Sequence, residues 1–151
     1  MRTLKESILS STNTGKVALF IPNTKEELIE MIKKEIYKKG LNCDLNHIQT
    51  HKITDMSSLF YLSHFNGDIS NWDVSNVVDM NYMFYGSRFN SDISKWDVSN
   101  VVDMHNMFKY SHFNQDISNW KVNSKCNTNH IFNNSCIKNK NKPKKDGKTI
   151  K

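Results

Sequence analysis

Cysteine is scarce in this 151-residue sequence, which contains only Cys43, Cys126 and Cys136. The three cysteines form no CxxC pair, and their odd number argues against a disulfide framework and against a zinc site. We therefore expect three free thiols and no bound metal. Free thiols fit a reducing compartment, so the cysteine usage favours a cytoplasmic location.

Long apolar runs are also absent, because no stretch approaches the roughly 18 residues that a membrane span requires. The sequence therefore predicts no transmembrane segment. The first residues, MRTLKESILSSTNTGKVALFIP, lack the charged n-region, the long apolar h-region and the cleavage site of a signal peptide. We therefore expect no export by the general route.

Sequence motifs that are typical of enzymes are missing as well. The sequence contains no glycine-rich phosphate loop, no GxSxG, no HExxH and no paired acid and base pattern. Its six histidines do not form a set of metal ligands. We therefore predict a non-catalytic protein without a cofactor.

The net charge of +6 invites a nucleic-acid interpretation, but the positive charge is concentrated at the end of the chain. Residues 41–136 have a net charge of −3, whereas residues 137–151 contain seven lysines and one aspartate. A basic tail of this kind is usually solvated and disordered, which is our prediction here. The alternative is an arm that contacts nucleic acid or another anionic surface. Such an arm would use Lys138, Lys140, Lys142, Lys144 and Lys145.

An internal repeat organises the rest of the chain. Residues 65–88 match residues 89–112 at 17 of 24 positions without a gap. The same frame extends in both directions into more divergent units, as expected at the ends of a stacked array. The four units are residues 41–64, 65–88, 89–112 and 113–136.

Two apolar spacings follow one another within a unit. In the second unit, Trp72 and Val74 alternate with polar residues as in a strand. Met80, Met83 and Phe84 then have the spacing of one helical turn. We therefore expect each unit to contain a short strand, a corner, a short helical segment and a return loop. One such unit cannot bury its apolar side, so neighbouring units must stack, with equivalent strands paired in parallel.

The second and third units resemble the BspA-like surface-protein repeat, a relative of the leucine-rich repeat. Copies of that repeat read F-N-x-D-I-S-x-W-D-V-S-N-V-x-D-M-x-x-M-F, and the resemblance covers residues 41–136. It implies an α/β fold: a short right-handed solenoid of leucine-rich-repeat type, with stacked parallel strands and short helical segments. It also implies a cell-surface protein associated with adhesion or protein binding. The short chain and the lack of a visible secretion signal depart from that family, so the location stays open between cytoplasm and cell surface.

Two segments precede the units. PNTKEELIEMIKKEIYKKG predicts a helix within residues 23–40, because Thr24 and Glu27 form a capping box and Gly40 provides a stop. We expect this helix to cap the open core of the first unit, with partner binding as the alternative. Residues 1–22 contain a short apolar run, expected as a strand. The segment before that run either packs locally or docks to another copy or another protein.

Several residues recur at one position of successive units, and we interpret them as structural ladders. Recurring asparagines can satisfy the backbone of their own and the next unit, and recurring aspartates can accept from serines two residues later. The alternatives are calcium at the aspartates, whose order differs from an EF-hand, and stacking of sugars or bases on the tryptophans. The ladder residues are Asn42, Asn66, Asn90, Asn114, Asp68, Asp92, Asp116, Trp72, Trp96 and Trp120.

Positions seven, seventeen, eighteen, twenty-one and twenty-two vary between units and are therefore not needed for stacking. We predict that a partner protein binds there, through Tyr82, Tyr85, Lys95, His105, Asn106, Lys109 and Tyr110. Two other functions stay open: a structural component of a larger particle that docks through residues 1–22, and an anionic contact through the tail. An uncovered end after the last unit would also invite self-association.

Overall fold

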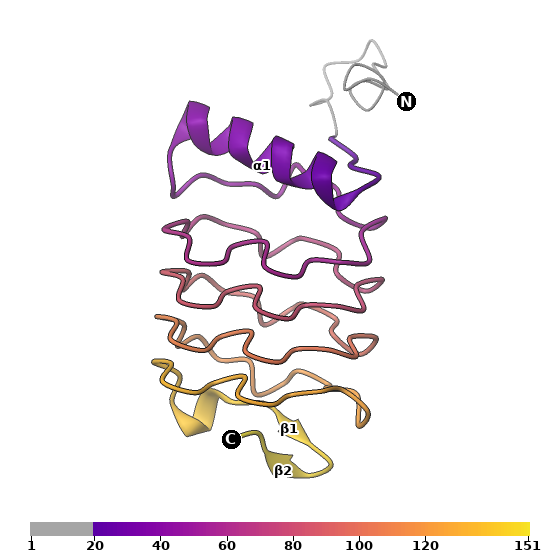
Figure 1. Cartoon of the computed structure of the whole chain (residues 1–151), viewed down its shortest axis with the longest axis vertical. Coiled ribbons are helices and arrows are strands. Elements are labelled where there is room, and N and C mark those ends of the chain that lie inside the picture. The colour runs from indigo at the N-terminus through magenta and orange to yellow at the C-terminus, as the bar shows by residue number, and fades with distance from the viewer. Residues whose placement is uncertain (1–19) are drawn as a thin grey trace.

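The computed structural model of the chain describes residues 20–151 (Figure 1). Within this range, α1 spans Lys25–Lys39, η1 spans Asn139–Asn141, β1 spans Lys144–Lys145 and β2 spans Lys148–Thr149. α1 lies at one end and the β1–β2 hairpin at the other, and the four 24-residue units lie between them as successive layers. Within residues 20–151, no helix is both long and apolar enough to cross a membrane.

The expected α/β solenoid of leucine-rich-repeat type, with parallel strands and short helical segments, is wrong. Most of the described chain is irregular, and it contains one α-helix and one two-stranded antiparallel sheet, β1–β2. Successive units are joined instead by isolated parallel bridges. Those at position fifteen are Asp55–Asp79, Asp79–Asp103 and Asp103–Asn127.

The backbone amides of positions sixteen to twenty-two explain why neither strands nor helices form. In the second unit, the amides of Met80 and Phe84 donate to the third unit, at Asp103 O and Met107 O. Between them, the amide of Met83 donates to Met80 O within its own unit. Successive amides thus alternate: one donates to a carbonyl of the next unit, and the following one closes a turn within its own unit. This pattern gives neither a continuous strand ladder nor the i→i−4 bonds of an α-helix.

Left-handed residues also interrupt this part of each unit. In the second unit, Tyr82 has φ 55° and Gly86 has φ 60°, and the same two positions are left-handed in every unit. A right-handed helix cannot continue through such residues. The turns nevertheless direct Met80, Met83 and Phe84 into the core, where all three are fully buried. The apolar spacing that predicted a helix therefore arises from consecutive turns.

Aromatic side chains form columns through the core. Phe60, Phe84, Phe108 and Phe132 stack with ring centroids 5.6, 5.4 and 5.8 Å apart. The three tryptophans are buried, and each indole N–H donates to a carbonyl of the preceding unit at 3.0 or 3.1 Å. The pairs are Trp72 with Leu45 O, Trp96 with Ile69 O and Trp120 with Ile93 O. Stacking of a sugar or base on these rings is therefore excluded, because the rings belong to the core.

The asparagine ladder runs through three units and into the tail. Asn66 Oδ1 accepts from the amide of Asn90 at 2.7 Å, and Asn90 Oδ1 accepts from the amide of Asn114 at 2.8 Å. Asn114 Oδ1 then accepts from the amide of Lys138 at 2.9 Å. Asn42 is exposed and donates or accepts no such bond among the described residues.

α1 covers the first unit. The helix follows Thr24, whose side chain accepts from the amide of Glu27 at 3.2 Å, and it is followed by Gly40 at φ 88°. Its apolar residues buried against the unit are Leu28, Met31 and Ile32. Of the segment expected to dock or to form a strand, residues 1–19 lie outside the described residues, and Phe20 forms a parallel bridge with Ile48.

Residues 137–151 differ from the disordered tail that their composition predicted. They form η1 and the β1–β2 hairpin across the end of the fourth unit, where Ile137 and Ile150 are buried. Ile137 stands 24 residues after Phe113, so the tail begins in register with the units. The two buried isoleucines anchor the segment by apolar burial. The seven lysines of the segment predicted disorder because composition alone does not show this burial.

Candidate partner-binding surface

Four tyrosines from the first three units gather with one histidine, and we call this group the tyrosine surface. Its members are Tyr61, Tyr82, Tyr85, His105 and Tyr110. Tyr85 is central, with ring centroids of Tyr61, Tyr82 and Tyr110 at 5.1, 5.4 and 5.6 Å. The Tyr82 ring also lies 4.9 Å from that of His105. The rings thus form one connected network across three layers.

The stacking of the units brings these rings together. Tyr61 and Tyr85 occupy position twenty-one of consecutive units, so their rings stack at an interplanar angle of 13°. The third unit carries Lys109 at this position, and its Nζ lies 5.2 Å from the centroid of the Tyr110 ring. A cation–π contact therefore extends the aromatic network in the third layer.

The tyrosine surface is accessible to solvent. Tyr61 and Tyr110 are 46% and 49% exposed, and Leu62, next to Tyr61 in the chain, is 58% exposed. Tyr82, Tyr85 and His105 are half-buried. Contiguous exposed aromatic rings are typical of binding surfaces, since tyrosine is enriched at protein interfaces.

Tyr82 and Tyr110 occupy backbone positions that do not favour tyrosine. Their φ angles are 55° and 59°, and a left-handed residue with a Cβ atom costs roughly 1–2 kcal/mol. Equivalent positions in neighbouring units carry Asn106 in place of Tyr82 and Gly86 in place of Tyr110. Both of those residues adopt this conformation more easily. Backbone conformation therefore does not favour these two tyrosines.

Charged groups accompany the aromatic rings. Asp103 Oδ1 lies 2.8 Å from His105 Nδ1. In the first unit, the equivalent Asp55 lies 3.2 Å from Lys25 Nζ of α1. Burial tends to raise the pKa of Asp55, but hydrogen bonds from Ser57 and Lys25 outweigh it and lower this pKa. Asp55 is therefore an anion at neutral pH and ties the first turn of α1 to the first unit.

Five of the seven predicted binding residues belong to or contact the tyrosine surface, namely Tyr82, Tyr85, His105, Lys109 and Tyr110. Lys95 does not, because it lines a shallow hollow beside Trp96 and Lys121. Asn106 is a left-handed turn residue whose buried Oδ1 has no hydrogen-bond partner among the described residues. Tyr61 was missed, although its place at position twenty-one signalled it.

The tail lysines do not act as one group. Lys145 Nζ donates to Cys126 O at 2.9 Å, and Lys142 Nζ lies 5.5 Å from the centroid of the Phe132 ring. These two lysines are therefore engaged in closing the end of the fourth unit. The exposed members of the set are Lys138, Lys140 and Lys144.

The ladder aspartates bond to their own turns. Hydrogen bonds from Ser70 lower the pKa of Asp68, and hydrogen bonds from Ser118 lower the pKa of Asp116. Asp92 likewise accepts from the amide of the serine two residues later, at 2.8 Å. Within residues 20–151, no three His, Cys, Asp or Glu side chains come together as a group that could hold a metal ion.

Together, the layers and the tyrosine surface define a small protein built from stacked 24-residue units. The chain belongs to the family described as "Mycoplasma protein of unknown function, DUF285", whose family model matches residues 27–145. No curated protein and no solved structure matches the chain.

Proposed function

We propose that the chain is a non-catalytic protein-binding module whose tyrosine surface contacts a partner protein. The observation that carries this proposal is the presence of tyrosine at two left-handed positions, 82 and 110. A bulky residue at a strained backbone position, with a side chain that solvent can reach, is better explained by binding than by folding. The finer relation to BspA-like repeats, with its adhesion-type role, is part of the proposal and is supported by the FNxDIS and WDVSNVVDM stretches of the second and third units.

The chemistry of tyrosine suits this role. A tyrosine ring supplies a large apolar area, its hydroxyl supplies a hydrogen bond, and only two χ angles have to be fixed on binding. Here the rings already restrain one another, since Tyr61 stacks on Tyr85 and Tyr82 contacts His105. A partner therefore meets a partly preorganised surface and loses less conformational entropy on association.

The decisive variant combines Tyr82→Asn with Tyr110→Gly, which copies the residues that neighbouring units carry at these positions. We expect its free energy of unfolding to be unchanged or raised by about 1 kcal/mol, because relief of left-handed strain offsets the lost ring contacts. Urea denaturation followed by circular dichroism measures this. A strongly destabilised variant would instead assign the tyrosines to the fold.

Binding is measured with the same variant. Immobilised wild-type protein captures partners from the cells that produce it, and each captured protein is then purified and titrated by calorimetry. We expect the double variant to bind at least about tenfold more weakly. The matched control is Tyr37→Ala, because Tyr37 is 92% exposed on α1 and lies outside the tyrosine surface. Equal binding by the wild type and the double variant would contradict the proposal. Loss of partner binding only when residues 1–22 are removed would instead favour a structural component that docks through that segment.

A further inference from the structure

One set of hydrogen bonds between successive units recurs in the second half of the first three units. At positions sixteen, eighteen, twenty and twenty-two, each backbone amide donates to a carbonyl of the next unit. From the third unit, Met104, Asn106, Phe108 and Tyr110 donate to Asn127 O, Asn129 O, Ile131 O and Asn133 O at 2.8, 3.1, 2.9 and 3.0 Å. The first and second units make the same four bonds to the units that follow them.

The fourth unit has no such unit after it, and its four equivalent donors are open. The amides of Thr128, His130, Phe132 and Asn134 have no acceptor among the described residues, and we call them the open amide row. The carbonyls of residues 127–133 are already used, either by local turns or by the amides of the third unit. The row therefore presents donors only.

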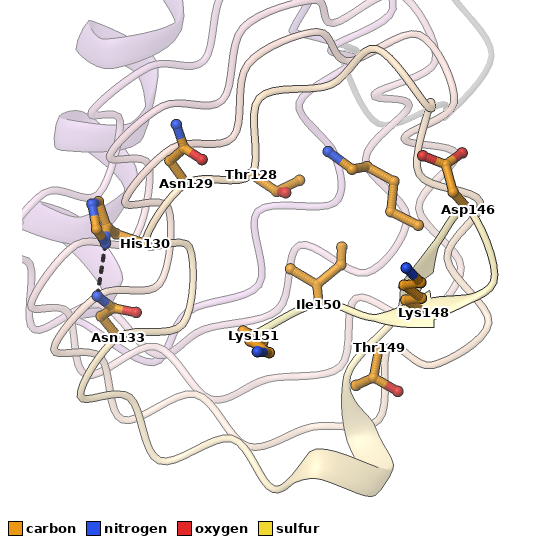
Figure 2. A pocket seen from close by; sticks show the side chains of 10 residues that line it. Thr128, Asn129, His130, Asn133, Asp146, Lys148, Thr149, Ile150 and Lys151 are labelled. Carbon is orange, nitrogen blue, oxygen red and sulfur yellow. Dashed lines mark hydrogen bonds between the residues drawn. The ribbon is translucent and has the colours of Figure 1, made fainter.

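The tail covers side chains of the fourth unit, including the Phe132 ring beneath Lys142, but accepts no hydrogen bond from the four amides of the row. Lys145 Nζ donates to Cys126 O, a carbonyl that precedes the row in the chain. An open hollow of about 520 Å³ lies between the row and the last residues of the chain. Figure 2 shows Thr128 and His130 along one side of this hollow and Lys148 on the other.

A donor-only row selects the kind of segment that fits it. An ordinary parallel strand presents both N–H and C=O groups along its edge, so its N–H groups would find no acceptor here. A repeat unit presents carbonyls at positions fifteen to twenty-one and keeps the intervening amides for itself. In the third unit, for example, the amides of His105, Met107 and Lys109 bond within the unit. Of the two, only a repeat unit leaves no backbone N–H group of the docked segment unpaired.

A folded second copy of this chain does not fit the row. The equivalent carbonyls are free only in its first unit, and α1 covers that end (Figure 1). Lys25 of α1 donates to Asp55 Oδ1 at 3.2 Å and to Ser57 Oγ at 2.6 Å. These two residues carry the first two carbonyls of the set, so α1 lies where the partner would have to dock.

We propose that the open amide row docks a repeat segment of another polypeptide, parallel to the fourth unit and with one carbonyl on each amide. The segment is of the type D-M-x-x-M-F-x-x, as in residues 103–110, whose carbonyls meet the equivalent amides of the second unit. The partner class is thus a protein with the same repeat and no helix over its first unit. This inference goes beyond the tyrosine surface and does not rest on it.

Nuclear magnetic resonance tests the proposal on the full chain. The probe is an acetylated and amidated peptide that copies residues 103–111, DMHNMFKYS, titrated to low millimolar concentration into ¹⁵N-labelled protein. We expect chemical-shift changes and slower hydrogen exchange at the open amide row, while the amides of Met80 and Phe84 stay unchanged. A peptide with the same residues in scrambled order should leave the row unaffected.

A pair of proline variants sharpens this test. Thr128→Pro removes an N–H that makes no bond within the described chain, and we expect the peptide to bind about tenfold more weakly. Ser124→Pro is the matched control in the same unit. Its amide is also unbonded, and it is the second residue of the turn closed by Cys126 N and Asn123 O, where proline is favoured. We expect Ser124→Pro to bind as the wild type does.

Three outcomes would overturn the proposal. They are slow exchange of the row in the free monomer, peptide-induced shifts that lie elsewhere or are absent, and equal binding by the two proline variants. If Thr128→Pro does not fold, the shifts and the scrambled peptide decide alone. Binding of duplex DNA that Lys148→Glu abolishes, without any peptide-induced shift at the row, would replace the proposed partner by an anionic one.

Discussion

The two ends of the stack bury the same kind of core by different means. At the N-terminal end, α1 covers the first unit with one face of a regular helix, which includes the buried Leu28 and Ile32. At the C-terminal end, residues 137–151 cover the fourth unit with the buried Ile137 and Ile150. The first cap is one regular helix. The second begins in register with the units at Ile137 and then forms η1 and the β1–β2 hairpin instead of a fifth unit.

This difference shows that closing a core and ending a hydrogen-bond ladder are separate tasks. Lys142 Nζ lies 5.5 Å from the Phe132 ring at the end of the phenylalanine column, and Lys145 Nζ satisfies Cys126 O. A lysine can do both, because its methylene stem covers apolar surface while its ammonium group reaches an acceptor. The lysine ammonium group is a donor only, however, so neither of these two side chains can pair with the amides of the open amide row.

The largest effect is expected at the helical cap. Leu28 is fully buried, so Leu28→Ala removes a packed side chain and leaves a cavity, and we expect the free energy of unfolding to fall by about 3 kcal/mol. Urea denaturation followed by circular dichroism measures the loss. Tyr37→Ala on the same helix is the control and should change stability by less than about 0.5 kcal/mol. A loss below about 1 kcal/mol at Leu28 would mean that α1 is not a cap of the core.

A smaller loss is expected at the other cap. Ile150 is 7% exposed and directly follows β2, a strand of only two residues, so neighbouring residues can relax into the space that Ile150→Ala creates. We expect a loss of about 2 kcal/mol, at the low end of the range for such changes. Lys148→Ala, at an exposed position of the same hairpin, should have little effect in the same urea titration. Equal losses of unfolding free energy for Leu28→Ala and Ile150→Ala would show that the two caps contribute equally to stability.

The units and their apolar positions could be read from the sequence, because a 24-residue period repeats each contact in every layer. Their secondary structure could not, since consecutive turns bury Met80, Met83 and Phe84 with the same spacing as a helical turn. The left-handed backbone was equally hidden, because bulky residues such as Tyr82 and Leu62 occupy it. Most of the tyrosine surface followed from variability between units, and Tyr61 could have been included on the same ground because it occupies the variable position twenty-one.

Acid is expected to weaken the N-terminal end more than the C-terminal end. Glu35 of α1 lies 2.6 Å from Lys39 Nζ and 3.3 Å from His47 Nε2. Burial alone would raise the pKa of Glu35, but the hydrogen bond from Lys39 and the charges of His47 and Lys39 outweigh it and lower this pKa. A carboxyl whose pKa is lowered on folding stabilises above its unfolded pKa, here 4.5, and this contribution is lost as pH falls through the folded value.

Glu35→Gln measures this contribution. We expect the variant to be less stable than the wild type by about 1 kcal/mol at about pH 6, and we expect the difference to shrink as the pH falls below 4.5 through the folded pKa. Urea titrations across this range give the two curves. Glu30→Gln, at an exposed position of the same helix, should follow the wild type. A Glu35→Gln curve parallel to that of the wild type would show that the ion pair does not hold α1.

The smallest effects concern how often each end opens, and the three free cysteines report on them. Cys43 of the first unit and Cys126 of the fourth are buried, whereas Cys136 is exposed. Burial raises the pKa of Cys43 and raises that of Cys126 to about 11, so both thiols should resist iodoacetamide near neutral pH while Cys136 reacts. Peptide mass spectrometry of a labelling time course measures each rate.

The two cap variants then separate the ends. Because local opening exposes only the residues beneath the part that opens, Leu28→Ala should accelerate the labelling of Cys43, and Ile150→Ala should accelerate that of Cys126. Cys136 serves as the internal control, since its rate should not change. If either variant accelerated both buried cysteines equally, the stack would open as one cooperative unit, and the difference between its ends would concern stability alone.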